Sequence, residues 1–460
     1  MSNFGNCPMM KLTIEKLQKI VDGQLIAITD RDVLIKDIII DSRKITAGAL
    51  FVALAGEKFD GHQFVKQSFN AGALLALVEH PIDSTLPQIV VRSTHRALGL
   101  IAKWFREQSQ AQFIALTGSS GKTSVKEMTA TILAECGPTL FTQGNYNNDI
   151  GVPLTLFRLS EQDKFAVIEL GANHIGEISY TTEIVKPHIA LINNITAAHL
   201  EGFGSLAGVA QAKGEIFSGL TEKGIAIINL DSFSQNWFEL IKDHLLYTFA
   251  LDNSKADFYA KSVNQHEGTH FILHTPNGEI DINLPVMGLH NVTNALAAAA
   301  LATSAGASLN DIKVGLEKVK AVKGRLYPIR LNDNQLILDD SYNANVGSMT
   351  AAIHVLADQK GYRVLVVGDM AELGSEAEQL HKKVGQEAKN AKIDCVISVG
   401  NNSALISQFS EVGHHFNCKH EVNSYLQQLL KEKQCATVLI KGSRSAKMEE
   451  IIENILNNQE

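Results

Sequence analysis

QFIALTGSSGKT, at residues 112–123, is the stretch that decides the fold of this chain. Its first half, Gln112–Thr117, is apolar enough for a buried strand, and apolar residues recur at helical spacing after it. The glycines between strand and helix allow a tight turn that points backbone N–H groups at phosphate oxygens, and Lys122 adds a positive charge. A hydroxyl such as that of Thr123 can hold a magnesium ion. The stretch predicts a phosphate-binding loop made of Thr117, Gly118, Ser119, Ser120, Gly121, Lys122 and Thr123.

One position of the loop departs from the strict phosphate-loop pattern, which has glycine where this chain has Leu116. An ordinary Gly/Ser turn that caps a helix is the other interpretation of the sequence. Gly-Lys-Thr at a junction of strand and helix favours the nucleotide interpretation. The loop by itself implies that a nucleoside triphosphate binds, and it does not imply a reaction.

Strands and helices alternate on both sides of the loop. Between residues 89 and 324, further apolar runs predict strands at Phe165–Leu170, Ile189–Ile195 and Ile225–Leu230. Such alternation indicates a mostly parallel sheet covered by helices.

Two segments near the end of this region break the alternation. Short alternating strands within residues 257–285 flank Asn277-Gly278, which predicts a local hairpin. The stretch Asn291–Thr303 is apolar on nearly all sides, so we expect a buried helix.

The chain divides into three domains by its patterns. Residues 10–88 indicate a small α/β domain, and residues 89–324 the central sheet. In residues 325–460 the alternation restarts, which predicts a Rossmann-like domain. A dehydrogenase is disfavoured, because no GxGxxG follows a strand. We therefore expect an α/β protein of three domains.

Composition narrows the class of protein. Over 460 residues the formal net charge is −8, so the chain lacks the general positive charge of nucleic-acid binders. The longest apolar stretch, Ala295–Ala302, is far too short to span a bilayer, and the N-terminus lacks the apolar run of a signal peptide. We expect a cytoplasmic protein that binds no nucleic acid and inserts into no membrane.

The five cysteines are scattered and form no CxxC pair, which fits free thiols in a reducing compartment. A group of possible metal ligands comprises His414, His415, Cys418 and His420. Its spacing is not that of a structural zinc site, and it contains one thiol only. We predict no zinc there.

Three side chains downstream of the loop are candidates for its chemistry. Glu169 ends a predicted strand, at the edge where parallel sheets bind ligands, and magnesium prefers carboxylate oxygens. His199 follows the next strand; a histidine there is more often a satisfied polar residue or a cap than a magnesium ligand. Lys213 precedes an apolar stretch, and a solvated helix lysine is its simplest interpretation.

The ordered motifs of the chain resemble the Mur ligase family of cell-wall amide ligases. The resemblance covers the chain from about residue 10 and is carried by these segments: TGSSGKT at 117–123, GNYNNDIGVP at 144–153, IELGANHIGEI at 168–178, NNITAAHLEGFGS at 193–205, AKGEIF at 212–217, GLHNVTNALAAA at 288–299, KGRLYP at 323–328 and LDDSYNAN at 338–345. Each motif is moderately specific alone, and the ordered set is highly specific.

Within the family, the chain is most similar to the member that adds D-alanyl-D-alanine to UDP-N-acetylmuramoyl-tripeptide. DSRKITAGALFVALAGEKFDGH at 41–62 resembles the UDP-sugar-binding first domain. SYNAN at 341–345, VVGDMAELG at 366–374 and KGSRSAKMEE at 441–450 resemble the third domain of the dipeptide-adding enzyme, and the Asp-Asn-Pro-Arg signature of the diaminopimelate-adding relative is absent from the sequence.

The resemblance implies a role for each candidate residue. Residues 118–123 would cradle the ATP phosphates, Thr123 and Glu169 would bind one magnesium ion, and His199 a second. Lys213 would match a lysine that many relatives carbamylate, and its carbamate would help to place the second ion. The remaining implied contacts are Asn291 and Asn294 near the adenine, Asp340 at the ribose, Arg325 at the γ-phosphate, and Ser42, Arg43, Asn145, Asn147 and Asn148 on the UDP-muramoyl peptide.

The implied reaction is an ATP-dependent amide ligation through an acyl phosphate, with Lys122, Lys213, His199 and Arg325 in the catalytic group and a monomer as the acting unit. Two other functions stay open. A sister ligase would add a single amino acid; a folylpolyglutamate synthase is disfavoured, because such enzymes generally lack the UDP-binding first domain. A non-catalytic ATP switch would need neither Arg325 nor the set formed by Glu169, His199 and Lys213.

One position differs from many relatives, which have proline after the SYNAN segment where this chain has Val346. We expect valine to take the extended conformation that a proline favours, with no change in function.

Overall fold

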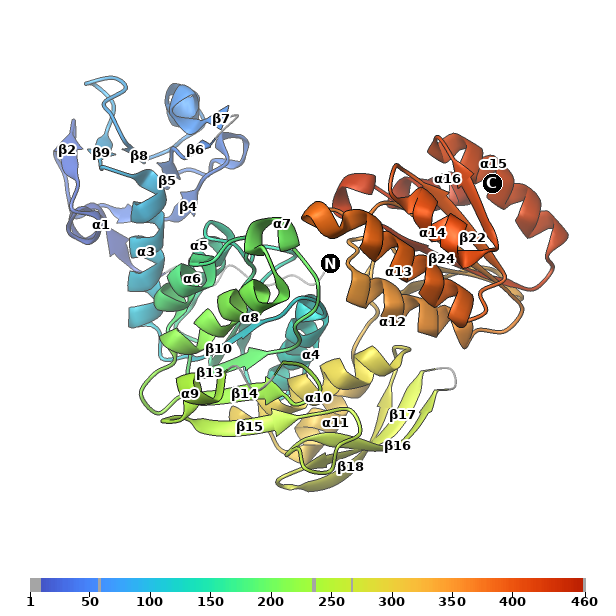
Figure 1. The fold of residues 1–460 in the computed structure, drawn as a ribbon. Coiled ribbons are helices and arrows are strands. Elements are labelled where there is room, and N and C mark those ends of the chain that lie inside the picture. The colour runs from blue at the N-terminus through green and yellow to red at the C-terminus, as the bar shows by residue number, and fades with distance from the viewer. Residues whose placement is uncertain (1–9, 57–58, 234–236, 266–267, 458–460) are drawn as a thin grey trace.

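The computed structural model describes residues 10–56, 59–233, 237–265 and 268–457, which form three α/β units (Figure 1). The first unit and the third stand apart on either side of the central one. Within the described residues, no helix is both long and apolar enough to cross a membrane.

The first unit contains a five-stranded sheet. Its order is β2 (Gln24–Ile26), β9 (Gln88–Val90), β8 (Leu75–Val78), β5 (Ala49–Val52) and β4 (Asp37–Ile39), with helices α1 (Ile14–Val21) and α2 (Val65–Asn70). Two short antiparallel pairs accompany it, β1 (Leu12–Thr13) with β3 (Leu34–Ile35) and β6 (Ala55–Gly56) with β7 (Phe59–Asp60). Since β9 pairs with β2 and β8, the border predicted at residue 88 falls inside a strand of this sheet.

The central unit is built on a six-stranded parallel sheet. Its order is β11 (Thr139–Phe141), β12 (Phe165–Glu169), β10 (Gln112–Thr117), β13 (Ile189–Ile192), β14 (Ile225–Asn229) and β15 (Leu245–Phe249). Residues alternate along β10: Phe113 and Ala115 join one core, and Ile114 and Leu116 join the other. This alternation is why helices cover both faces.

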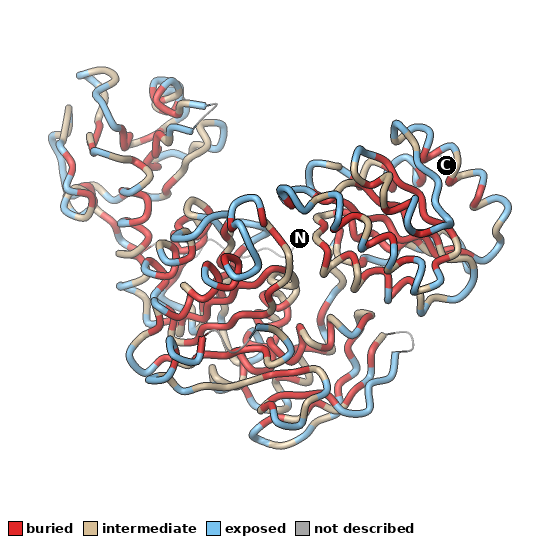
Figure 2. The backbone as a smooth tube through the Cα atoms, viewed as in Figure 1, coloured by how far each residue is buried: buried red, intermediate tan, exposed pale blue. Residues whose placement is uncertain are grey.

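The helices divide between the two faces. One face carries α3 (Thr94–Gln108), which leads in from the first unit, with α5 (Gly151–Leu156), α6 (Glu177–Val185) and α8 (Leu206–Gly214). The other face carries α4 (Lys122–Ala134), α10 (Leu289–Ser304) and α11 (Leu309–Glu317). Helix α10 is buried along most of its length, which confirms the prediction for that segment (Figure 2).

The predicted hairpin is part of a three-stranded antiparallel sheet. It comprises β16 (Tyr259–Gln265), β17 (Thr269–Thr275) and β18 (Gly278–Leu284), and β17 and β18 meet at the expected turn. Two short helices, α7 (Leu200–Phe203) and α9 (Phe238–Ile241), complete the described part of the central unit.

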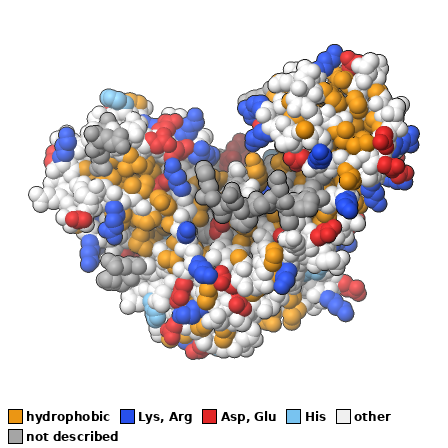
Figure 3. All heavy atoms as spheres, turned by 180° about the vertical axis from the view of Figure 1, so that it is seen from behind, with side chains coloured by type: hydrophobic (Ala, Val, Ile, Leu, Met, Phe, Trp, Pro, Cys, Tyr) orange, Lys and Arg blue, Asp and Glu red, His pale blue; other side chains and the backbone are white. Residues whose placement is uncertain are grey.

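The third unit has a six-stranded sheet in the order β19 (Tyr327–Asn332), β20 (Gln335–Asp340), β24 (Ala436–Lys441), β21 (Tyr362–Val367), β22 (Cys395–Val399) and β23 (Gly413–Phe416). Only β19 runs antiparallel to its neighbour. Its faces are covered by α12 (Val346–Ala357), α13 (Ala377–Asn390) and α14 (Ser403–Ser410) on one side, and by α15 (Lys419–Glu432) and α16 (Glu449–Asn457) on the other. From behind, the surface is notched between the first and third units (Figure 3).

The expectation that Val346 takes an extended conformation is wrong. Val346 is the first residue of α12, and Asn345 caps that helix by accepting a hydrogen bond from the Ser348 N–H at 2.8 Å. The first turn of a helix tolerates proline, because its N–H has no partner within the helix. A proline and a valine therefore both suit this position, for a reason other than the expected one.

Candidate functional site

Two cavities meet at the loop between β10 and α4. The first, of about 470 Å³, lies between the central and third units, and the second, of about 400 Å³, lies beside α10. Ser120, Gly121, Arg325 and Ser348 line both cavities. The loop thus stands where two ligand-sized spaces join, at the carboxyl end of the parallel sheet, as the sequence predicts.

The loop has the backbone that its sequence requires. Gly121 caps α4 with a φ of +75°, and a Cβ atom there would lie 2.4 Å from Oδ1 of Asn294, so only glycine fits. Lys122 donates a hydrogen bond from Nζ to the carbonyl of Gly118 at 2.8 Å. Burial lowers the pKa of Lys122, an effect that the carboxylate of Glu169 opposes. Thr117 is fully buried and donates a hydrogen bond to the carbonyl of Leu170, so it fixes the end of β10 from which the loop begins.

Two asparagines that the sequence analysis left without a role hold the loop in place. Asn194 accepts hydrogen bonds from the Ser120 N–H at 2.9 Å through Oδ1 and from the Ser119 N–H at 2.9 Å through its carbonyl. Asn193 donates from Nδ2 to the carbonyl of Ser120 and to Oδ1 of Asn294, each at 3.0 Å. Both follow β13, so the neighbouring strand end fixes the loop.

Glu169 presents a buried carboxylate to the first cavity. Its side chain is 1% exposed, and Oε1 accepts a hydrogen bond from Nδ2 of Asn147 at 2.7 Å. Its Oε2 atom has no hydrogen-bond partner among the described residues. A buried carboxylate oxygen without a partner is costly unless a cation or donor arrives, so this oxygen fits a magnesium ion. Thr123 lines the same cavity.

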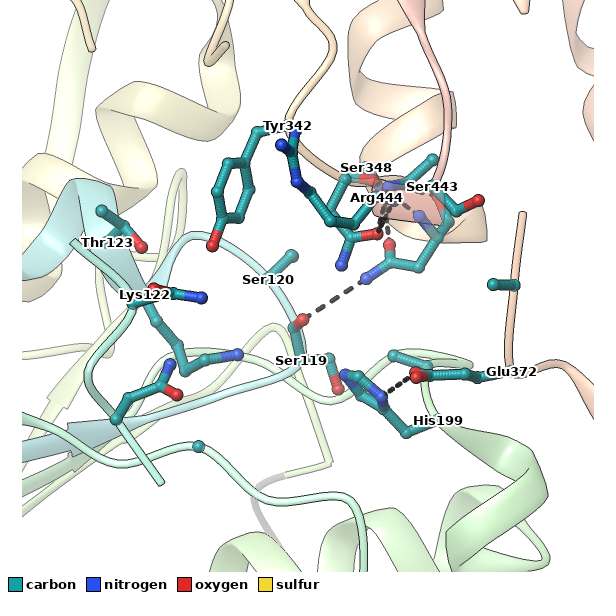
Figure 4. Close-up of a pocket in the computed structure, with 18 of the residues that line it drawn as sticks. Ser119, Ser120, Lys122, Thr123, His199, Tyr342, Ser348, Glu372, Ser443 and Arg444 are labelled. Carbon is teal, nitrogen blue, oxygen red and sulfur yellow. Dashed lines mark hydrogen bonds and ion pairs between the residues drawn. The ribbon is translucent and has the colours of Figure 1, made fainter. Parts of the chain in front are cut away.

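His199 and Glu372 meet across the boundary between the central and third units (Figure 4). His199 precedes α7 with a φ of +54°, and Glu372 has a φ of +61°. A left-handed backbone costs a residue other than glycine about 1–2 kcal/mol, so both positions are held by their surroundings. The carboxylate of Glu372 contacts Nδ1 of His199, and this contact lowers the pKa of Glu372.

Lys213 is not the solvated helix lysine of the simplest interpretation. It lies in α8, is 1% exposed, and its Nζ is 5.3 Å from the centre of the Phe203 ring. Desolvation lowers the pKa of Lys213 well below its usual value, and the charge of Lys122 acts in the same direction. Lys213 therefore tends toward a neutral amine. It does not line either cavity.

The second cavity contains the residues expected near the adenosine. Asn291, Asn294 and Asp340 all line it. His290 lies there too, and burial lowers its pKa to about 4. Lys441, for which the sequence analysis gave no role, donates to Oδ2 of Asp340 at 2.6 Å and is 1% exposed.

Arg325 occupies the linker between the two units. Consecutive carboxylates of β20 hold the backbone on both sides of it: the Gly324 N–H donates to Asp339 and the Leu326 N–H to Asp340, each at 3.2 Å. The guanidinium lies 4.4 Å from the centre of the Tyr342 ring. A cation over an aromatic face is stabilised, so the side chain has a defined place between the cavities.

The residues predicted to hold the UDP-muramoyl peptide are not brought together. Asn145 and Asn147 line the first cavity, whereas Asn148 lines neither cavity and accepts a hydrogen bond at 2.8 Å from the N–H of Gly151, the first residue of α5. Ser42 and Arg43 lie on the first unit and line neither cavity; Arg43 pairs with Asp41 at 2.8 Å.

The third unit supplies a wall of the first cavity that the sequence analysis did not assign. Its members are Tyr342, Asn343, Ala344, Asn345, Ser348, Ala371, Glu372, Ser443, Arg444 and Ser445. Most of them follow β20, β21 or β24 at the carboxyl ends of parallel strands, and this position was the available signal. The amide of Asn345 reaches the central unit, where it donates to the carbonyl of Ser119 at 3.3 Å.

Comparison with known families and proteins gives matches along most of the chain. Residues 34–106 match the Mur ligase family catalytic domain, residues 116–302 the Mur ligase middle domain, and residues 324–444 the Mur ligase glutamate ligase domain. The chain is 54% identical to the UDP-N-acetylmuramoyl-tripeptide--D-alanyl-D-alanine ligase of Escherichia coli (strain K12), over 98% of this chain and 99% of that protein. It is 34% identical to the ligase of the same name from Bacillus subtilis (strain 168), over 98% and 99%.

Solved structures agree with these matches. A crystal structure of MurF from Acinetobacter baumannii superposes with a TM-score of 0.94 at 39% identity, covering 98% of this chain and all of that one. The MurF ligase of Thermotoga maritima in complex with ADP superposes with a TM-score of 0.84 at 25% identity, covering 92% and 97%.

Proposed function

This chain belongs to the Mur ligase family, and from that premise we propose that it joins D-alanyl-D-alanine to UDP-N-acetylmuramoyl-tripeptide at the expense of ATP. The product is the UDP-muramoyl-pentapeptide used in peptidoglycan synthesis. The observation that carries this function is the meeting of three features in one cavity: the phosphate loop, the Oε2 atom of Glu169, which has no partner in the described part of the chain, and Arg325 from the linker.

The first step is a transfer of phosphate to the substrate carboxylate. The carboxylate at the end of the tripeptide attacks the γ-phosphorus of ATP, which gives an acyl phosphate and ADP. The two reactants repel each other, so the site must first neutralise their charge. Lys122 and Arg325 supply positive charge from the loop and from the linker.

The residues also fit a magnesium requirement. Glu169 and Thr123 would hold one ion, and His199 with a carbamylated Lys213 would hold a second. Bound magnesium neutralises phosphate oxygens and aligns them for in-line transfer. The buried, unpartnered oxygen of Glu169 supports the first ion, and the depressed pKa of Lys213 supports the neutral amine that carbamylation requires.

The second step forms the amide. The amine of D-alanyl-D-alanine attacks the acyl carbon, a tetrahedral intermediate forms, and phosphate leaves. Hydrolysis of the acyl phosphate competes with this attack, so the wall from the third unit serves to exclude water and to orient the acceptor. No covalent intermediate on the protein is needed.

The remaining assignments follow from the same arrangement. Asn291, Asn294 and Asp340 bind the adenosine part of ATP in the second cavity, and Asn145 and Asn147 bind the muramoyl peptide in the first. Ser42, Arg43 and Asn148 remain candidates for the UDP-linked substrate. A monomer as the acting unit stays an expectation from the family resemblance, and the nucleotide substrates support a cytoplasmic reaction.

The test is a phosphate-release assay with mass detection on the purified protein, ATP, magnesium and UDP-muramoyl tripeptide. We expect release that depends on D-alanyl-D-alanine, and a product heavier than the tripeptide substrate by one dipeptide less one water. Turnover with a single amino acid, but none with the dipeptide, would identify a sister ligase instead. ATP hydrolysis that ignores both acceptors would identify a nucleotide switch.

A further inference from the structure

We propose that Glu372 binds the ammonium group of the incoming D-alanyl-D-alanine and thereby positions its nitrogen for attack on the acyl carbon. This inference rests on the proposed function, because it names the residue that receives the second substrate of that reaction. Three observations support it: the charges that line the first cavity, the backbone that holds Glu372, and the position of its carboxylate.

Cations predominate in the first cavity. Among the described residues that line it, Lys122, Arg325 and Arg444 carry positive charge, and Glu169 and Glu372 are the two carboxylates. The cations suit ATP and the tripeptide carboxylate, but they repel an ammonium group. Either of the two carboxylates can offer the acceptor amine a partner of opposite charge.

Glu169 is not available for that role. It is buried at the end of β12. One of its oxygens accepts a hydrogen bond from Asn147, and the other suits a metal ion. The side chain of Glu372 is 49% exposed and comes from the third unit. It is thus the acidic side chain that a ligand can reach in this cavity.

The backbone around Glu372 fixes where its carboxylate points. A φ of +61° is unfavourable for glutamate, and the segment is held at Glu372 itself and at the next residue. Leu373 is 2% exposed, and the carbonyl of Glu372 accepts a hydrogen bond from the N–H of Glu201 in the central unit at 3.2 Å. The side chain is therefore directed across the boundary between the units, toward His199 (Figure 4).

The carboxylate of Glu372 is directed toward the part of the cavity where the amine of the dipeptide has to meet the acyl phosphate. His199, Glu169 and Lys122 line the same cavity, so the acyl phosphate forms next to them. In the structure the carboxylate of Glu372 already contacts a ring nitrogen, Nδ1 of His199. The ammonium group of the dipeptide takes over this acceptor position, releases one proton to solvent, and the neutral amine then lies beside the acyl carbon that it attacks.

The test compares Glu372→Gln with the wild type in steady-state kinetics. The substitution keeps the size of the side chain and removes its charge. Since a charged partner strengthens a hydrogen bond, we expect the KM for D-alanyl-D-alanine to rise about tenfold or more, with the KM values for ATP and for the UDP-linked substrate changed less than about twofold. Glu376→Gln is the matched control, because Glu376 is exposed on the same segment and lines neither cavity. Glu372→Asp retains the charge and should stay closer to the wild type than Glu372→Gln does.

A second measurement separates amine binding from the earlier step. Hydroxylamine is largely uncharged at neutral pH and captures acyl phosphates as hydroxamates without needing an acidic partner. We expect the wild type and Glu372→Gln to form hydroxamate from the UDP-linked substrate at equal rates when the dipeptide is absent.

Each other outcome is informative. An unchanged KM for the dipeptide in Glu372→Gln would overturn the role of Glu372. Equal losses of ligation and of hydroxamate formation would overturn it too. A raised magnesium requirement would instead make Glu372 part of the metal site. If the wild type released no phosphate with the dipeptide and formed no hydroxamate without it, the proposed function itself would be wrong.

Discussion

Lys441 and Asp340 form a buried ion pair, with Nζ 2.6 Å from Oδ2, between adjacent strands of the third unit at the edge of the second cavity. The other oxygen of Asp340 accepts the hydrogen bond of Leu326, beside Arg325. The pair therefore joins the sheet of the third unit to the linker.

Lys441→Met should destabilise the protein strongly. It leaves the carboxylate of Asp340 buried without its cation, and breaking such a pair typically costs about 3–5 kcal/mol. Urea unfolding without nucleotide measures the loss. The double variant Lys441→Met/Asp340→Asn removes both charges and should recover most of it. An equal loss in the double variant would assign the cost to packing rather than charge.

Glu169→Gln should reduce activity and leave stability intact. The substitution removes the charge that we assign to a magnesium ion, so the apparent magnesium requirement should rise and kcat should fall by about 100-fold or more. In EDTA, the Tm should be equal to or above that of the wild type, because a buried and unpartnered charge disappears. A large drop in Tm would show that Glu169 serves mainly the fold.

Lys122→Ala should abolish ADP formation while UDP-substrate binding persists. The amine of Lys122 lies in the loop, and its partner there is the carbonyl of Gly118. Its charge is needed where the γ-phosphate is transferred, and the UDP-linked substrate has other predicted contacts. Isothermal titration with the UDP-linked substrate is the measurement, and equal loss of binding and turnover contradicts this division of roles.

Lys213 should carry a carbamate in solution with carbon dioxide. Its buried amine has a pKa well below the usual value, and carbamylation requires the neutral form. Carbon-13 NMR after incubation with labelled bicarbonate should show a carbamate signal that is missing from Lys213→Met. Lys126→Met is the matched control, because Lys126 is also fully buried but pairs with Glu127 at 2.8 Å. A signal that survives in Lys213→Met excludes this site.

The ion pair of His95 with Asp149 should make stability depend on pH. Its atoms lie 2.6 Å apart and tie α3 to the segment that precedes α5. Asp149 raises the pKa of His95 above 6.5, and His95 lowers the pKa of Asp149 below 3.8. The contribution of His95 to the free energy of unfolding is complete below pH 6.5 and is lost as the pH rises through the raised pKa of His95. The contribution of Asp149 is present above pH 3.8 and is lost as the pH falls through the lowered pKa of Asp149.

The pair should therefore stabilise the protein most between about pH 4 and 6.5. Both side chains are about 40% exposed, so solvent screening limits the effect to about 0.5 kcal/mol. The free energy of unfolding of His95→Gln should fall below that of the wild type at pH 6, with a smaller difference at pH 9. In a double-mutant cycle with Asp149→Asn the coupling should vanish at high pH, and a coupling that is constant across pH contradicts the assignment.

Elements that local patterns specify could be predicted from the sequence. The strand at Gln112–Thr117 matches its predicted bounds, and the strand predicted at Phe165–Leu170 ends one residue earlier, since each is a continuous apolar run. The turn that joins Gln112–Thr117 to α4 was predicted from its glycines and from its position between a strand and a helix, and its binding of phosphate stays a prediction. Short edge strands such as Thr139–Phe141 were missed, because three residues carry too little pattern.

Contacts between segments that are distant in the sequence could not be predicted from it. The burial of Lys213, the pairing of His199 with Glu372, and the role of Asn194 under the loop depend on packing between units or on neighbouring strands. Position at the carboxyl end of a parallel strand was the one general signal of a residue at the site. Glu169 has this position, and so does Lys441. A residue type alone could not distinguish a solvated lysine from a buried one.

The first cavity is bounded by two units that the linker around Arg325 connects, and this has a consequence for inhibition. A compound that fills the space touches both walls, so its affinity includes the free energy of holding the units at one angle. Substitutions in the linker that remove no contact with the compound would then weaken its binding by favouring another angle. Resistance would map to hinge residues such as Gly324 and Leu326 as well as to contact residues.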